Sequence, residues 1–384
     1  MSEEQGNSGH GRILLAVFTA ATAYGVTFPF IATRLELWGT SGSLIGLNAA
    51  MPALGWFLGS FLLPRLQRRL SMPSLLAFSL VIAIATWSVF FLASEYWLWT
   101  PVRFLFGGSV GLFFRAIEFG LNTLDAENSR GRVFAIYTII FGLGIALGAA
   151  LQPLLSEDSL VLFLAVSLGF FGAIYFSSRW HIPSETRFEP SRLATWKLVA
   201  RNAPLPLLVA CVYGYLEDIP AYLLSVYAMK KGLDADIASY TLTAAAIGSV
   251  TLPFPLGVYS DKFGRGKGLV AAAVGSLIFT VAMPWMVFSP SLFLSVIVLW
   301  FGFISSLYAI ALAMIGDQWQ RNGLVTANAA FGATYAAGGL VGPLLNGIFI
   351  DAMNSEGIIA SAYTALAVLL LVFAVYAFHR RTAS

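Results

Sequence analysis

The sequence contains little charge. Only 11% of its 384 residues are Asp, Glu, Lys or Arg, whereas 58% are hydrophobic, and the mean hydropathy is +0.79. Soluble domains carry about 25% charged residues, so this chain cannot cover a water-facing surface of ordinary polarity. Disordered chains combine low hydrophobicity with high charge, and that class is excluded as well. A polytopic membrane protein is the class that remains.

Cysteine, histidine and nucleotide-binding motifs are also scarce. The single Cys211 excludes an internal disulfide and a cysteine-based metal site. The three histidines, His10, His181 and His379, lie outside the apolar segments or at their ends and form no cluster with metal-ligand spacing. The G-x-x-x-x-G-K-[ST] loop of an ATP-driven motor is absent. We expect no enzyme, no cofactor, no metal and no nucleic-acid partner.

Long apolar runs predict membrane-spanning helices. A β-barrel would show alternating segments of about 10 residues, whereas a helical span takes about 20 apolar residues. We expect an all-α polytopic membrane protein with twelve spans near residues 13–37, 43–66, 73–93, 97–121, 132–155, 159–178, 204–229, 236–258, 268–288, 291–316, 323–352 and 358–379.

A polar stretch at 179–203 divides these spans into two six-helix bundles, 1–178 and 204–384. With the N-terminus inside, 17 of the 22 basic residues fall on the inner side, and only Lys230 and Lys231 lie in outer loops. Cytoplasmic loops are rich in Lys and Arg. We therefore expect both termini and the middle loop in the cytoplasm. We also expect the protein to be a monomer in the lipid bilayer of the cell inner membrane.

Glycines and prolines recur between the two halves. At a single offset of 190 residues, Gly142, Gly148 and Pro153 recur as Gly332, Gly338 and Pro343. A looser echo pairs Tyr24, Gly25 and Pro29 with Tyr213, Gly214 and Pro220. The pattern predicts a six-helix duplication with pseudo-symmetric halves, and parallel halves with a pathway between them are a known transporter plan.

The loop after the eighth expected span carries a family signature. The run Gly257-Val-Tyr-Ser-Asp261-Lys262-Phe-Gly264-Arg265-Gly-Lys267 resembles the G-x-x-x-D-[RK]-x-G-R-[RK] motif of the major facilitator superfamily. Within that superfamily, residues 103–132 resemble the YcaD-like branch. The resemblance covers the whole chain, and it implies secondary transport by alternating access between the two halves.

The resemblance also implies that this loop takes part in gating. Asp261 would be stabilised by a helix N-terminus, worth about 0.3–1 kcal/mol when exposed, and Arg265 would pair with Asp317. A plain positive-inside loop with a tight glycine turn is the alternative. The corresponding loop of the first half departs from the motif, since Arg68 replaces the Asp and Ser71 replaces the Gly; Arg68 and Arg69 are its gating candidates.

Two acidic residues lie deep in an expected span. Glu217 is 13 residues after Pro204, about 20 Å along a helix, and Asp218 follows it. An ionisable group at a helix centre costs about 2.5–3.5 kcal/mol on insertion scales. We expect one of the two to bind a coupling proton, with a static ion pair to an arginine as the alternative. Adjacent helical residues point about 100° apart, so the two should face different partners.

Three more charged residues lie in the fourth expected span. Arg115 and Glu118 share one helix face, and Arg115 is a candidate anchor for a substrate carboxylate or phosphate; an intrahelical ion pair is the alternative. Arg103 and Gly107 resemble the superfamily's R-x-x-x-G motif, which implies a part in proton transfer. Snorkelling of Arg103 to the membrane interface is its alternative.

Polar and aromatic side chains within the spans are candidates for lining a solute cavity, although helix packing is the more common role of such residues. Besides Arg115 and Glu118, the expected substrate contacts are Tyr24, Gln152, Tyr213, Trp300, Asn328 and Tyr335.

The leading hypothesis is a secondary active transporter that moves a small organic solute by alternating access with protons as the coupling ion. The glycine-rich fifth span lacks the adjacent Gly-Pro pair of the exporters' motif, because Gly148 and Pro153 are separated; the direction stays open, with export slightly favoured. Alternatives are a non-transporting membrane sensor on a transporter scaffold and a translocase for lipids or amphiphiles.

Overall fold

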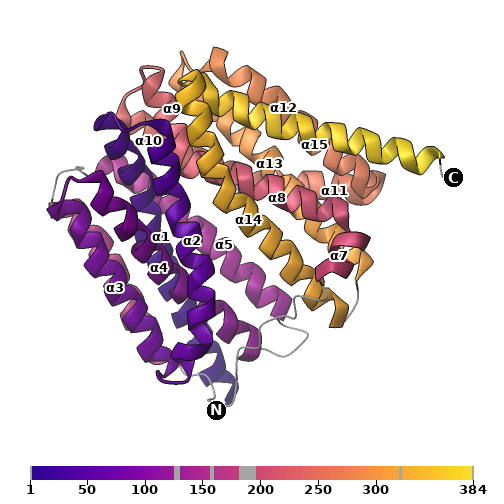
Figure 1. Cartoon of the computed structure of the whole chain (residues 1–384). Coiled ribbons are helices and arrows are strands. Elements are labelled where there is room, and N and C mark those ends of the chain that lie inside the picture. The colour runs from indigo at the N-terminus through magenta and orange to yellow at the C-terminus, as the bar shows by residue number, and fades with distance from the viewer. Residues whose placement is uncertain (1, 125–129, 156–159, 181–195, 320–321, 383–384) are drawn as a thin grey trace. The chain divides into compact units, whose positions relative to one another are not determined.

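The computed structural model describes residues 2–124, 130–155, 160–180, 196–319 and 322–382, and these ranges form helices joined by short turns, with no strand among them (Figure 1). The helices of the first part of the chain are α1 (Ser2–Leu37), α2 (Gly42–Gln67), α3 (Met72–Leu92), α4 (Tyr96–Leu124), α5 (Arg130–Leu151), the 3₁₀ turn η1 (Gln152–Leu154) and α6 (Leu160–Ser177).

The second part contains two interrupted spans among its described residues. A short helix α7 (Trp196–Asn202) precedes α8 (Pro204–Asp218), which continues through the π-helical turn η3 (Ile219–Leu223) into α9 (Leu224–Lys230). The expected eighth span is divided before a proline into α10 (Ala235–Thr251) and α11 (Pro253–Phe263). The remaining helices are α12 (Arg265–Met286), α13 (Pro290–Gln318), α14 (Asn322–Met353) and α15 (Glu356–Thr382).

Length and composition mark most of these helices as membrane spans. Among the described residues, 11 helical segments are long and apolar enough to cross a bilayer; the remaining expected span corresponds to α2, a helix of 26 residues that is not among them. Large apolar side chains are exposed on the helices, for example Leu92, Trp97 and Phe288 at 84, 71 and 85%. Such a surface is suited to lipid contact rather than to water.

Contacts between residues divide the chain into two compact units. The first unit comprises Met1–Leu35 and Met51–Pro190, and the second comprises Glu36–Ala50 and Ser191–Ser384. Residues 181–195, most of the expected middle loop, lie outside the described part of the chain. The loop boundaries at 179–203 therefore stay a prediction.

In the first unit, α1 and α5 touch through their backbones. A Cβ atom placed on Gly25 would lie 2.4 Å from the carbonyl oxygen of Ile145, and one on Gly148 would lie 2.1 Å from that of Thr22. Only glycine permits this separation, because a non-bonded carbon and oxygen need more than about 3 Å. The contact is the close helix approach that small residues allow in membranes.

In the second unit, α8 and α14 repeat the same contact. A Cβ atom on Gly214 would lie 2.1 Å from the carbonyl oxygen of Tyr335, and one on Gly338 would lie 2.0 Å from that of Cys211. These residues follow their counterparts in the first unit by 189 or 190 positions. The repeated sequence therefore produces a repeated helix contact.

A second glycine contact recurs in the same way. In the first unit, a Cβ atom on Gly55 of α2 would lie 2.6 Å from the amide nitrogen of Gly108 in α4. In the second unit, a Cβ atom on Gly248 of α10 would lie 2.9 Å from the amide nitrogen of Gly302 in α13. Each unit thus has two pairs of helices held at backbone contact.

The segment Glu36–Ala50 is bound to the second unit by polar contacts. The Asp351 carboxylate of α14 accepts the backbone N–H groups of Gly42 at 2.6 Å and Ser43 at 2.9 Å. Lys230 Nζ lies 2.9 Å from Glu36 Oε1. Asp351 therefore caps the N-terminus of α2, where the helix leaves N–H groups without intrahelical acceptors.

Candidate functional site

Glu217 lies at the middle of the span Pro204–Lys230 and is half-buried. Tyr213, one turn earlier on α8, donates its hydroxyl to Glu217 Oε1 at 3.1 Å, and Tyr335 of α14 donates to Oε2. The ion pairs within the described residues do not include Glu217. Neutral hydroxyls therefore provide the hydrogen bonds of this carboxylate. A hydrogen bond to a charged group contributes about 1.5–3 kcal/mol, which offsets part of the free-energy cost of burying the charge.

A third tyrosine completes an aromatic wall beside Glu217. The ring centroid of Tyr308 in α13 lies 4.7 Å from that of Tyr213 and 5.8 Å from that of Tyr335. The rings of Tyr213 and Tyr335 are also 5.8 Å apart. We call Glu217, Tyr213, Tyr308 and Tyr335 the tyrosine–glutamate site. Tyr308 was not predicted, although a tyrosine in the middle of an apolar span was a visible signal.

Asp218 also lies beside α14. Its Oδ2 atom is 3.5 Å from the position that a Cβ atom on Gly339 would occupy. The two acids therefore lie beside different residues, but both of them lie beside α14. Tyr335 and Gly339 are one turn apart on α14, so two adjacent side chains of α8 reach successive turns of the same helix.

The helix widens directly after these acids. In η3, the N–H of Leu224 donates to the carbonyl oxygen of Ile219, a π-type hydrogen bond five residues long. Pro220, which has no N–H to donate, lies inside this turn. Single π turns in helices occur frequently at functional sites, and this one adjoins Asp218.

Arg115 and Glu118 form the ion pair expected from their spacing. Arg115 Nη1 lies 3.2 Å from Glu118 Oε2, and the two side chains are 49 and 22% exposed. Tyr137 of α5 donates its hydroxyl to Glu118 Oε1 at 3.1 Å. Glu118 is therefore held from two helices of the first unit, whereas half of Arg115 stays accessible. Tyr137 was not predicted, because it lies on another helix and no sequence spacing links it to Glu118.

Arg103 lies inside the first unit rather than at a membrane interface. Its side chain is fully buried, and its guanidinium carbon lies 5.8 Å from the ring centroid of Phe28 in α1. This cation–π distance and the burial contradict the snorkelling alternative. Tyr24, at the position that matches Tyr213, packs its ring on Phe28 at 4.6 Å. Phe28 thus stands in the first unit where Glu217 stands in the second.

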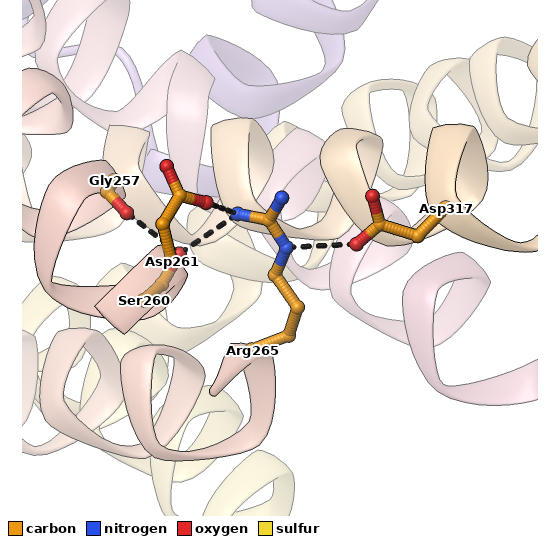
Figure 2. A network of polar contacts seen from close by, with 5 residues as sticks. All are labelled: Gly257, Ser260, Asp261, Arg265 and Asp317. Carbon is orange, nitrogen blue, oxygen red and sulfur yellow. Dashed lines mark hydrogen bonds and ion pairs between the residues drawn. The ribbon is translucent and has the colours of Figure 1, made fainter. Parts of the chain in front are cut away.

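Arg265 joins three helices in a polar cluster (Figure 2). Its Nε donates to Asp317 Oδ2 of α13 at 2.9 Å, and its Nη1 donates to the Asp261 carboxylate of α11 and, at 3.1 Å, to the Ser260 hydroxyl. Ser260 in turn donates to the Gly257 carbonyl at 2.9 Å. The pairing with Asp317 is as predicted. Asp261 is bound by Arg265, and its stabilisation by a helix N-terminus stays a prediction. We call this the arginine clamp.

The other residues of the two loops make fewer contacts. Lys262 is exposed, with Nζ 5.4 Å from the centroid of the Phe263 ring, and no atom lies within 4 Å of the position that a Cβ atom on Gly257 would occupy. Arg68 and Arg69 are exposed, and neither takes part in an ion pair within the part of the chain that the structure describes. The clamp of the second unit therefore has no described counterpart at these arginines.

Gly264 is required by its backbone conformation. It joins α11 to α12 at φ +102° and ψ 142°, a region that is costly for residues with a side chain. We expect Gly264→Ala to lower stability by about 1–3 kcal/mol, measured as a lower thermal unfolding midpoint of the purified protein. Gly266→Ala is the matched control, because neither glycine has an atom within 4 Å of its Cβ position. Equal midpoints for the two variants would contradict this prediction.

The remaining residues that were expected to contact the substrate differ in how far they are buried. Trp300 is buried, and its indole N–H donates to Thr280 Oγ1 at 2.8 Å, which is a packing contact between α13 and α12. Gln152 is buried in the turn η1. Asn328 of α14 is exposed. Of these, Asn328 alone offers an open amide to a solute.

Comparison with known proteins gives a consistent match. The model of the Major Facilitator Superfamily matches residues 13–303 and 207–384. The chain is 26% identical over 359 residues to the uncharacterized MFS-type transporter YfkF of Bacillus subtilis, covering 90% of each sequence. It is 24% identical over 250 residues to the uncharacterized MFS-type transporter YcaD of Escherichia coli, covering 65% of this chain and 64% of the relative.

Solved structures share the fold at low sequence identity. A crystal structure of the nucleoside transporter NupG aligns with a TM-score of 0.74 at 13% identity, covering 97% of this chain and 98% of that one. A bacterial homologue of the lysosomal transporter Spinster, inward-facing and unoccupied, aligns with a TM-score of 0.71 at 13% identity, covering 97% of each. The predicted all-helical membrane fold is confirmed.

Proposed function

The chain belongs to the major facilitator superfamily of secondary transporters, and we propose that it couples the movement of a small organic solute to that of a proton, with Glu217 as the proton-binding group. The observation that carries the proposal is the bonding of Glu217. A carboxylate at the middle of a span is satisfied by two neutral hydroxyls and enters no described ion pair. It can gain and lose a proton without breaking a salt bridge.

The charged residues of the first unit are suited to a role other than proton binding. Arg115 and Glu118 already neutralise each other, so protonation of Glu118 would leave an uncompensated arginine in the span. We assign the exposed half of Arg115 to solute contact and Arg103, buried beside Phe28, to positioning within the first unit.

The arginine clamp supports a gating role for the signature loop. Arg265 ties α11 and α12 to α13 through charged side chains that are 29 to 62% exposed, and exposed pairs of this kind are worth at most about 1 kcal/mol each. Contacts of that strength can form and break during a transport cycle. In our proposal they do so as the two units provide alternating access.

The protein is a multi-pass membrane protein, and the basic residues support a more specific location. Seventeen of 22 lie on one side of the expected topology. By the positive-inside rule, we place the arginine clamp and both termini in the cytoplasm and the chain in the cell inner membrane.

Proteoliposomes that contain the purified protein and a trapped pH dye test the coupling. A thermal-shift screen of nucleosides, amino acids, sugars and organic cations first identifies a stabilising solute. We expect that solute to drive proton movement in the wild type and not in Glu217→Gln, because the amide cannot take up a proton. Asp218→Asn, the adjacent acid on α8, is the control and should retain coupling. Undiminished proton movement in Glu217→Gln would refute the assignment.

A further inference from the structure

One span of the second unit carries acidic residues at its centre, and basic residues are scarce in all of them. Five of the six expected spans, 204–229, 236–258, 268–288, 291–316 and 323–352, contain no Lys, Arg or His, and the sixth, 358–379, contains only His379 at its end. Glu217 and Asp218 lie at the middle of the first of them. Charge is poorly screened in a low-dielectric interior, so the Glu217 carboxylate makes the centre of the second unit attractive to a cation.

The hydrogen bonds on Glu217 leave its charge in place. Tyr213 and Tyr335 each donate to one carboxylate oxygen, which solvates the anion without neutralising it. An ion pair would have neutralised it, as Arg115 does for Glu118. A deprotonated Glu217 therefore retains a negative charge that a bound cation can compensate.

The neighbours of this charge are aromatic and accessible. Tyr308 and Tyr335 are half-buried, as is Glu217 itself, so each of the three keeps part of its surface exposed. Tyrosine rings attract cations through their negatively charged faces, and aromatic side chains around an ammonium group are a recognised means of binding it. A carboxylate among aromatic rings suits an organic cation better than a sugar or an anion.

We propose that the tyrosine–glutamate site binds monovalent organic cations, and that cation and proton exclude each other at the Glu217 carboxylate. The inference rests on the proposed function, in which Glu217 carries the proton. Binding converts the protonated acid and a free cation into a carboxylate–cation pair and a released proton. Because one carboxylate serves both ligands in turn, the transport that follows is an exchange of a cation for a proton.

Few other titratable groups surround Glu217 among the described residues, and of these only a carboxylate can take up the proton. On α8 these are Tyr213 and Asp218, on α14 Tyr335, and on α13 Tyr308. From α15, Ser361 contacts Tyr215 rather than Glu217. Asp218 is the other acid at this position, so it has to be tested alongside Glu217.

Titration of the purified protein with tetraphenylphosphonium, an organic cation, tests the proposal. We expect binding to release one proton in acidic, weakly buffered solution, and the dissociation constant to rise about tenfold for each unit of pH below the point where the site protonates. Glu217→Gln should lose both binding and proton release, whereas Asp218→Asn should keep them. Thermal midpoints show that each variant is folded.

Aromatic variants test the role of the rings. We expect Tyr308→Leu to weaken binding roughly five- to thirty-fold, as for the loss of a cation–π contact of about 1–2 kcal/mol. Tyr335→Phe, which keeps the ring, should weaken it less. The control is Tyr240→Leu at a half-buried tyrosine of α10, which should bind as the wild type does.

The outcomes separate this inference from the proposed function. Equal binding by the wild type and Glu217→Gln, or no binding by the wild type, overturns the cation site. If in that case Glu217-dependent proton movement with a neutral or anionic solute persists in proteoliposomes, the proposed function stands. Cation binding with proton release but without transport would support the site and refute the proposed function.

Discussion

Gly338→Ala is expected to unfold at a much lower temperature than the wild type, with a loss of about 3 kcal/mol, the upper end of overpacking costs. The added methyl group would lie 2.0 Å from the carbonyl oxygen of Cys211 in α8. That atom belongs to a helix backbone and cannot rotate away as a side chain would. The helices have to separate, which disrupts the α8–α14 contact along its length.

Gly214→Ala should behave in the same way, because its methyl group would meet the Tyr335 carbonyl oxygen at 2.1 Å. The control is Gly332→Ala, also in α14, where no atom lies within 4 Å of the Cβ position. Thermal unfolding of the purified variants, followed by size-exclusion chromatography, gives the comparison. Midpoints for Gly338→Ala and Gly332→Ala that agree within error would show that the backbone contact is not needed.

Asp351→Ala is the second substitution with a large expected effect. Its carboxylate caps α2 through the N–H groups of Gly42 and Ser43, and replacing a capping acid by alanine costs about 0.5–2 kcal/mol. A difference of about 1.4 kcal/mol changes an equilibrium tenfold. We therefore expect the segment Glu36–Ala50 to detach from α14 about ten times more often in the variant.

Thiol labelling measures that detachment. Cys211→Ser removes the only native thiol, and Ala49→Cys places a reporter at a position that is 4% exposed in the second unit. The labelling rate should rise about tenfold with Asp351→Ala, in line with the equilibrium change, and less with Asp351→Asn, which keeps one acceptor oxygen. Asp236→Asn, an exposed acid in the first turn of α10, is the control. An unchanged rate in Asp351→Ala would exclude the cap as a restraint.

The membrane class followed from composition, its helical form followed from the long apolar runs, and the duplication followed from glycine spacing. The spacing did not reveal which glycines matter. Gly142 and Gly332 recur at the same offset as Gly148 and Gly338, yet the first pair has open space around it and the second lies against a neighbouring backbone. The difference arises because the two glycines of each helix lie on different faces of that helix. Packing decides how each helix is rotated about its axis, and hence which face meets the neighbouring helix.

The candidate site was predictable where both partners lie on one helix or where a motif linked them. Arg115 with Glu118, and Arg265 with Asp317, are such cases. Tyr335 was a candidate from the sequence, but two tyrosines that approach these sites from other helices were not predicted. Tyr137 approaches Glu118 from α5, and Tyr308 joins the cluster from α13.

Cross-helix partners of this kind have no fixed sequence spacing, because they depend on how neighbouring helices are set against each other. The same reason explains why the sequence did not reveal that the two acids of α8 lie beside one helix. The roles of these residues in transport stay predictions.

Tyr335 belongs to both the helix contact and the tyrosine–glutamate site. Its carbonyl oxygen lies against Gly214, and its hydroxyl donates to Glu217 on the same helix as that glycine. The backbone contact and the hydrogen bond therefore join the same two helices, and hydrogen bonds weaken as they lengthen beyond their preferred range. The infrared stretching frequency of the Glu217 carboxylate should consequently change with the separation of α8 and α14. Vibrational spectroscopy of this one side chain can therefore follow the movement of the two helices.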